Sequence, residues 1–179
     1  MEYLALDIET TGLNLEKSQV LQIAAIHVSS KGKKYFNMFV DNGPIKYGEP
    51  VALSMNKHTF EQISKQGISN QQYQAANNWL IFLNNCLKES KVKNLTVAGK
   101  NVAGFDIPIL RNNGFKTDNF SHRVLDIGSL YLTDFGYIPN LNKVNELLGR
   151  EPVSHDALTD CEDIVAAIEY KMKQNERLK

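Results

Sequence analysis

The 179-residue sequence has only two cysteines, Cys86 and Cys161, and neither belongs to a Cys-x-x-Cys pair or a Cys/His cluster. A disulfide framework and a zinc site are therefore not indicated, and we interpret both residues as free thiols of a reducing compartment. No run approaches the roughly 18 apolar residues of a membrane span. The N-terminus also lacks the basic and apolar regions of a signal peptide. These absences predict a cytoplasmic protein with no membrane partner.

An excess of positive charge is missing as well. The chain has 20 basic and 20 acidic residues, so its formal net charge is zero. This balance argues against a basic surface that coats a nucleic-acid duplex. It leaves open a nucleic-acid substrate, because an acidic metal site can offset positive charge placed elsewhere. The length fits one domain over residues 1–179, and the composition is that of an ordinary globular protein.

The first 40 residues predict an antiparallel meander of three strands. Residues 3–9 are rich in apolar side chains and end at a Thr-Thr-Gly turn, and 20–29 and 34–40 are the next two strands. The link at 30–33 contains glycine and predicts a hairpin loop. The first ten residues of the segment 41–67 include two glycines and two prolines, and the apolar residues of the segment show little periodicity. We therefore expect mostly loop there.

Helices and strands alternate in the rest of the chain. The expected helices cover 69–88, 105–112, 140–148 and 156–174, and the expected strands cover 95–98 and 124–127. Gly149 is the expected C-terminal cap of the third of these helices. A meander followed by alternating elements predicts an α/β or α+β sheet with helices packed on it.

Asp7 and Glu9 are two residues apart on the first strand, so both carboxylates project from one face of the sheet. Two adjacent acids repel each other unless a positive charge lies between them, which suggests a metal ion. The pair alone is weak, since a D-x-E occurs by chance in roughly half of chains of this length. A solvated strand end is the alternative, but the strand is too apolar for an exposed edge.

Two further acids stand at the starts of helices. Asp106 follows Phe105 and is either an N-cap or a member of an acidic site. Asp126 has the same position before the next helix, and we interpret it as an N-cap.

His155 and Asp160 flank the start of the last helix. They can share a site only if His155 lies in the preceding loop, with Ser154 as the helix cap. Histidine titrates near neutral pH, so beside metal ligands it suits a general base. If these acids converge, they form a cage for hard divalent cations, which commonly serves phosphodiester hydrolysis.

The segments LDIETTGL, N-x-x-x-F-D and H-x-A-x-x-D occur in this order and resemble the three motifs of the DEDDh (DnaQ-like) 3′→5′ exonucleases. That family includes the proofreading subunit of bacterial DNA polymerase III, ribonuclease T and oligoribonuclease. The resemblance implies an α/β, ribonuclease H-like fold with a five-stranded mixed sheet in the order 3-2-1-4-5, flanked by helices.

The resemblance also assigns roles to residues. Two divalent cations, Mg²⁺ or Mn²⁺, would be held by Asp7, Glu9, Asp106 and Asp160, with His155 activating the attacking water. Contacts to the terminal nucleotide would come from Thr10, Thr11, Gly12, Leu13, Asn101 and Phe105. The chain has Lys100 where many members have histidine, and residues 54–59 differ from the family's usual stretch, so substrate preference stays open.

The expected function is a metal-dependent 3′→5′ exonuclease that releases nucleoside 5′-monophosphates from single-stranded ends, with DNA as the first choice. The alternative within enzymes is an exoribonuclease that trims RNA or short oligoribonucleotides. An alternative of another class is a non-catalytic module that binds nucleic acid or a polymerase. The resemblance leaves open a polymerase partner or a homodimer.

Overall fold

A computed structural model of the chain describes residues 1–66 and 72–177. Five strands form one sheet in the order β3-β2-β1-β4-β5, which confirms the predicted fold class. The strands β1, β2 and β3 pair antiparallel, whereas β4 pairs parallel to both β1 and β5. Their bounds are Tyr3–Thr10 for β1, Val20–Ser29 for β2, Gly32–Phe39 for β3, Leu95–Gly99 for β4 and Phe120–Asp126 for β5.

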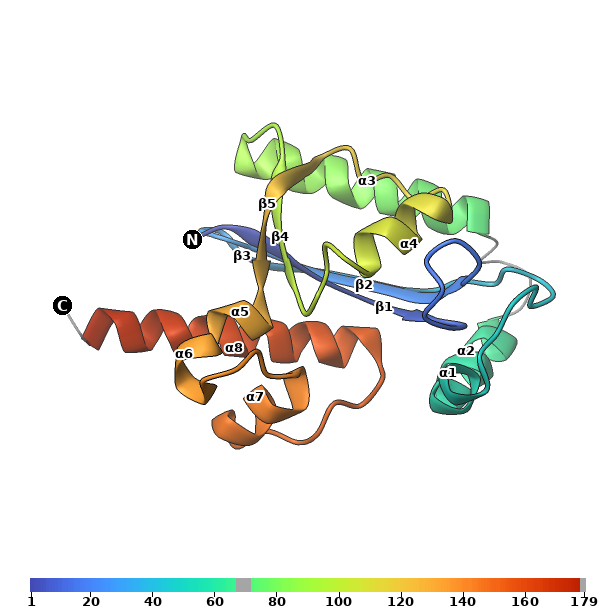
Figure 1. The fold of residues 1–179 in the computed structure, drawn as a ribbon. Coiled ribbons are helices and arrows are strands. Elements are labelled where there is room, and N and C mark those ends of the chain that lie inside the picture. The colour runs from blue at the N-terminus through green and yellow to red at the C-terminus, as the bar shows by residue number, and fades with distance from the viewer. Residues whose placement is uncertain (67–71, 178–179) are drawn as a thin grey trace.

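Helices cover both faces of this sheet (Figure 1). Helices α3 and α4 lie on one face, α5 to α8 lie on the other, and α1 and α2 lie beyond the end of β1. Their bounds are Pro50–Met55 for α1, Lys57–Gln66 for α2, Gln72–Ser90 for α3, Asp106–Asn112 for α4, Ile127–Leu130 for α5, Leu132–Phe135 for α6, Leu141–Leu148 for α7 and Ala157–Arg177 for α8. Within the described residues, no helix is long and apolar enough to cross a membrane.

The alternation of β1 decides which of its residues reach the functional end of the molecule. Leu4 and Leu6 belong to the core shared with Trp79 of α3, and Tyr3 and Ala5 belong to the core shared with α8. Because side chains on a strand alternate between faces, residues 7 and 9 continue the face of Tyr3 and Ala5. The strand therefore directs its two acids toward the side on which α8 packs.

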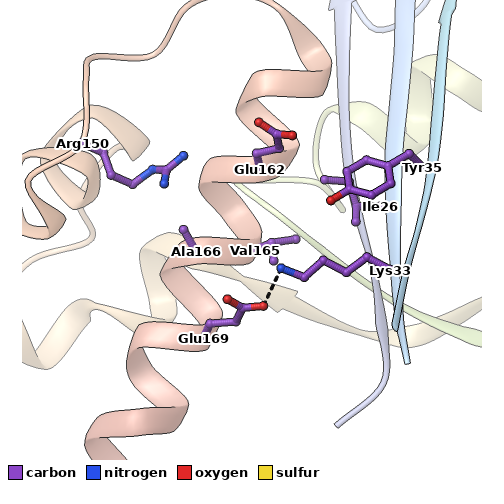
Figure 2. Close-up of a pocket in the computed structure, with 8 residues that line it drawn as sticks. All are labelled: Ile26, Lys33, Tyr35, Arg150, Glu162, Val165, Ala166 and Glu169. Carbon is purple, nitrogen blue, oxygen red and sulfur yellow. Dashed lines mark ion pairs between the residues drawn. The ribbon is translucent and has the colours of Figure 1, made fainter. Parts of the chain in front are cut away.

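The edge strand β3 leaves a shallow pocket against α8, of about 280 Å³. Figure 2 shows Lys33 from β3 reaching Glu169 of α8, and the two charged groups lie 2.7 Å apart. Tyr35 and Arg150 also line this pocket. The acids singled out in the sequence are absent from the residues described there, so this pocket is separate from the candidate site.

The prediction of mostly loop for residues 41–67 was wrong. The structure has α1 and α2 within this range, separated at Asn56. Pro50, which favoured a loop interpretation, is the first residue of α1, where the missing N–H of proline costs nothing and its fixed φ suits the helix. The two helices are short, so neither offers enough turns for a clear apolar periodicity.

The other boundaries need smaller corrections. Strand β5 begins at Phe120 rather than at 124, and α8 extends to Arg177. The predicted start of α3 at residues 69–71 lies outside the described residues. Gly149 ends α7 with φ of 66°, as predicted, and Asn140 caps its beginning by accepting a hydrogen bond from the Lys143 N–H.

Candidate active site

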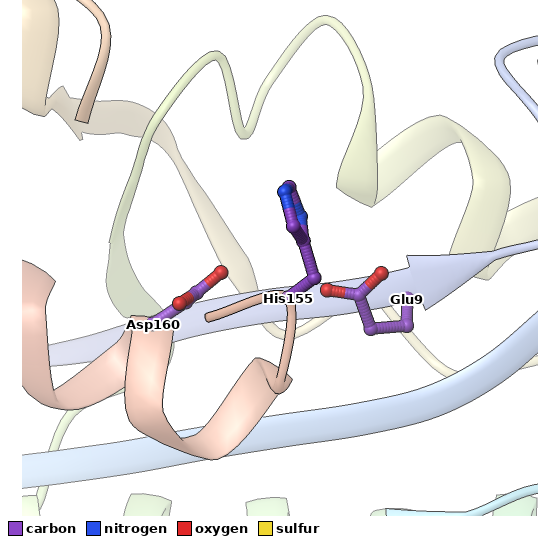
Figure 3. Close-up of side chains that lie close together, drawn as sticks. All are labelled: Glu9, His155 and Asp160. Atoms are coloured by element: carbon purple, nitrogen blue, oxygen red, sulfur yellow. The ribbon is translucent and has the colours of Figure 1, made fainter. Parts of the chain in front are cut away.

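The site lies at the end of β1, where a strand acid and the start of α8 meet. Glu9 on β1 is buried, with 7% of its surface exposed, and Asp160 in the first turn of α8 is buried too. Ligand atoms of Glu9, His155 and Asp160 all lie within 4.8 Å of one another. Figure 3 shows His155, from the loop before α8, close to both carboxylates. Residues from opposite ends of the chain are thus brought into one cluster.

The loop position expected for His155 is observed. The residue precedes α8, and its backbone has φ of 56°, in the left-handed region. The helix cap was predicted wrongly: Asp156, not Ser154, accepts a hydrogen bond from the Thr159 N–H at 3.0 Å. The Ser154 hydroxyl instead donates to the Asp160 carboxylate at 3.4 Å, and its N–H donates to the same carboxylate oxygen at 3.3 Å. Ser154 therefore holds Asp160, and its Oγ also accepts from the N–H of Asp156, the residue that caps the helix, at 3.3 Å.

Asp106 is the first residue of α4, and the helix cap is Phe105, which makes no side-chain capping bond. Asp106 is almost fully buried, and it raises the pKa of Asp7, so the two carboxyl groups are close enough to interact strongly. The N-cap alternative for Asp106 is therefore wrong. For Asp126 the same interpretation is confirmed, because its carboxylate accepts from the Ser129 N–H at 2.8 Å.

A pocket of about 240 Å³ opens above these acids. Asp7, Glu9, His155 and Asp160 line it together, whereas Asp106 is buried and is not among the lining residues. Its apolar lining comes from three parts of the chain, at Ile8, Leu13, Ala52, Met55 and Phe105. The pocket thus has an acidic floor and an apolar wall.

Burial and mutual repulsion make the acids hard to ionise. Burial is the largest cause in each case and raises the pKa of Glu9 to about 7, of Asp160 to about 7 and of Asp106 to about 8. The pKa of Asp7 is also raised well above its ordinary value, by burial and then by the charges of Asp106, Asp160 and Glu9. Such a cluster becomes stable in its charged form only when a cation compensates it.

The substrate residues expected from the first motif divide into two groups. Thr10 and the exposed Leu13 line the pocket. Thr11 and Gly12 do not: they form the turn that is packed against Glu49, whose N–H donates to the Thr11 carbonyl at 2.8 Å. A Cβ added at Gly12 would lie 3.0 Å from the Glu49 side chain, so glycine allows this close approach.

Of the two remaining residues expected to contact the nucleotide, Phe105 and Asn101, only the first lines the pocket. Asn101 is absent from the lining, and its N–H donates to the Asp126 carboxylate at 2.6 Å. Its backbone is left-handed, with φ of 55°. The structure therefore brings Phe105 to the acids but places Asn101 in a turn held by Asp126.

Sequence reasoning missed the contribution of α1. Asn56, at the junction of α1 and α2, is buried, and its Nδ2 donates to the Thr10 carbonyl at 3.1 Å. It lowers the pKa of Glu9. Ala52 and Met55 of α1 line the pocket beside it. The only available signal was Pro50, which is compatible with the start of a helix as well as with a loop.

Comparison with models of known protein families assigns this chain to a family. A family model described as an exonuclease (RNase_T) matches residues 4–168. The chain belongs to this exonuclease family. The match includes all three motifs, and it confirms the resemblance that they carry. A search of curated proteins gave no significant match.

Solved structures of nucleases share the fold. E. coli exonuclease I in complex with a 5cy-dT13 oligonucleotide superposes with a TM-score of 0.74 at 17% identity, covering 99% of this chain and 42% of that chain. The zinc-bound form of the E. coli exonuclease I complex with single-stranded DNA gives a TM-score of 0.69 at 15% identity, covering 99% and 41%. Cell-death related nuclease 4 (CRN-4) gives 0.69 at 12% identity, covering 97% and 64%. This chain therefore spans about two fifths of the exonuclease I chain.

Proposed function

We propose that this chain is a DEDDh 3′→5′ exonuclease that releases nucleoside 5′-monophosphates from single-stranded ends, and that residues 1–179 form one exonuclease domain. The observation that carries the proposal is the cluster of Glu9, His155 and Asp160 within 4.8 Å at the floor of a pocket. A histidine among buried carboxylates, on an exonuclease fold, suits hydrolysis at a phosphodiester better than a purely structural role.

The donor set fits divalent cations. Four carboxyl groups gather at one place, and carboxylate oxygens are the ligands that Mg²⁺ and Mn²⁺ prefer. Burial and mutual repulsion raise the pKa values of these groups, so a cation beside them would favour their ionised form at neutral pH, which supports the assignment. We assign Asp7, Glu9, Asp106 and Asp160 as the residues that would hold two such ions. When bound, the ions lower the pKa of a water and offset the charge of the phosphate.

The side chains of the pocket would have three further roles: proton transfer, holding the ions and contact with the base. His155 lines the pocket beside Glu9 and Asp160, and its imidazole accepts the proton of the attacking water. The carboxylates would hold the ions and partly cancel their charge, without taking part in proton transfer. Leu13, Met55 and Phe105 form an apolar surface for the terminal base, and a base stacked on an aromatic ring contributes about 1–3 kcal/mol.

DNA is the first choice of substrate, and RNA is the alternative. The exonuclease I structures with a similar fold contain single-stranded DNA, as in the dT13 complex, which supports an extended single strand as the ligand. The net charge of zero also favours a strand end in a pocket over a duplex held along its length.

The experiment uses 5′-labelled single-stranded DNA and RNA of equal sequence, each with Mg²⁺, with Mn²⁺ and with chelator. We expect a ladder that shortens from the 3′ end only with metal, and faster shortening of DNA. A faster reaction on RNA would favour the exoribonuclease. Absence of shortening with folded protein and metal would favour a non-catalytic binding module.

A further inference from the structure

Gln22 of β2 is a fully buried polar side chain next to the site. It lies directly opposite Glu9 in the pairing of β1 with β2. Its Nε2 donates one hydrogen bond to the Asp156 carboxylate, at 3.0 Å from Oδ2, and one to the side-chain amide of Asn37, at 3.0 Å from Oδ1. Its Oε1 accepts from the Ala157 N–H at 3.1 Å. The donor and acceptor groups of the amide are therefore all engaged.

Two of these partners immediately follow His155 in the chain. Asp156 also caps α8 through the Thr159 N–H. The peptide that leads from His155 into the helix is thus fixed to the sheet through Gln22 and to the helix through Thr159. A shift of this peptide would leave the buried amide of Gln22 without its partners, which is strongly unfavourable.

His155 itself depends on such support. Its φ of 56° lies in the left-handed region, which only about a few per cent of residues other than glycine adopt, and the surrounding contacts must hold it there. Other anchors act earlier in the loop: Asn142 accepts from the Val153 N–H, and Asn145 donates to the Glu151 carbonyl. Among the described contacts, Gln22 is the side chain that ties the peptide after His155 to the sheet.

We propose that Gln22 is a positioning residue, which holds the Asp156–Ala157 backbone so that His155 faces Glu9 and Asp160. This inference rests on the proposed exonuclease function and adds a residue that none of the three motifs contains. Gln22 acts through His155 and not on the substrate, because it is absent from the pocket lining and has no exposed surface.

The first test compares Gln22→Met with Gln72→Met. Methionine has nearly the shape of glutamine but lacks the amide. Gln72 also uses its side chain for one hydrogen bond, to the Asn113 carbonyl at 2.6 Å, so it is a matched control outside the site. We expect Gln22→Met to lower kcat roughly 10²-fold with little change in KM, as for a misplaced catalytic group. Gln72→Met should keep both constants. An unchanged kcat in folded Gln22→Met would overturn the proposal.

A second variant tests the same hydrogen bond in case Gln22→Met does not fold. Asp156→Asn can keep the cap on Thr159, but its amide nitrogen cannot accept the hydrogen bond from Gln22. We expect a fall in kcat in the same direction.

The substitution Gln22→Met is also combined with His155→Ala. If Gln22 acts through His155, the double variant is no slower than His155→Ala alone, whereas a further 10²-fold loss would contradict the proposal.

Crystal structures of the variants test the positioning role of Gln22 independently of the proposed exonuclease function. We expect His155 in Gln22→Met to leave the left-handed region and its ring to move away from Glu9 and Asp160, whereas Gln72→Met keeps both. An unmoved His155 would overturn the positioning role. If the unaltered protein shortens neither DNA nor RNA, the proposed function fails, and the position of His155 in these structures still decides the role of Gln22.

Discussion

Asp7 combines the two opposing demands on a residue of this site. Its carboxyl group lies beside Asp106, Asp160 and Glu9, and burial and these neighbours raise its pKa. In the absence of a cation, an ionised Asp7 is therefore unfavourable for the fold. In the proposed cation site this charge would hold the ion, so the proposed function and stability oppose each other at Asp7.

We expect Asp7→Asn to abolish metal-dependent hydrolysis and to raise the Tm of the chelated protein at pH 8. Asparagine has no ionisable group to bury beside the other acids, so the Tm should rise by about 2–6 °C, since 1 kcal/mol corresponds to about 2–4 °C in a chain of this size. Calorimetry and the strand-shortening assay measure the two effects.

Asp118→Asn is the matched control. Asp118 is exposed, and it pairs at the surface with Lys116. This variant should keep both hydrolysis and Tm. Normal metal-dependent hydrolysis by Asp7→Asn would contradict the assignment of Asp7 as a ligand.

His155 is the residue for which proton transfer is proposed. We expect His155→Ala to reduce kcat by roughly 10²–10⁴, the usual contribution of a general base, and to leave cation binding largely intact. The exposed His122 on β5 provides the control, since His122→Ala changes a histidine far from the pocket lining. Loss of Mn²⁺ binding together with activity would instead make His155 a ligand.

At the scale of elements, α1 contributes part of the pocket wall from beyond the end of β1. Asn56, at its end, donates to the Thr10 carbonyl and to the Ala52 carbonyl and accepts from the Thr59 hydroxyl. One buried amide therefore joins the end of β1 to α1 and to the start of α2. The pocket wall formed by Ala52 and Met55 depends on this junction.

We expect Asn56→Ala to lower the free energy of unfolding by about 1–3 kcal/mol, because it leaves buried groups unpaired, and to raise KM by displacing the α1 wall. Denaturant unfolding and steady-state kinetics test both effects. Asn78→Ala on the exposed face of α3 is the control and should change neither. A stable Asn56→Ala with unchanged KM would show that α1 contributes nothing to binding.

The elements also show what the sequence could and could not predict. The strands around Asp7 and the helix after His155 were predictable, because long apolar patterns report burial on a sheet or a helix face. Helices α1 and α2 were not, because six- and ten-residue helices that follow a Gly- and Pro-containing segment give little periodicity. The cap at Asp156 and the role of Gln22 depend on contacts between distant segments, which no local pattern encodes.

In the described part of the chain, the carboxyl groups with raised pKa values all belong to the site, and the stability of the whole molecule should follow their titration. Each group binds a proton more tightly when folded, so its stabilising contribution is complete below the ordinary carboxyl pKa of about 4 and is lost as the pH rises through the folded pKa of about 7–8. With chelator, we therefore expect Tm at pH 8.5 to lie roughly 5–10 °C below Tm at pH 5.5.

Mn²⁺ should reverse this loss at pH 8.5, because it binds the ionised carboxylates of the folded state. Thermal unfolding at the two pH values, with chelator and with excess Mn²⁺, makes the measurement. Equal Tm values at both pH values with chelator would mean that the acids do not carry the burial cost inferred from their surroundings.

The central claim is that three distant segments build one site for two cations. The most direct measurement is a crystal structure with Mn²⁺, in which anomalous scattering locates each ion. We predict two peaks between Asp7, Glu9, Asp106 and Asp160, about 3.5–4 Å apart, as in two-metal nucleases. Peaks at other places only, or none at saturating Mn²⁺ and pH 8, would contradict the claim.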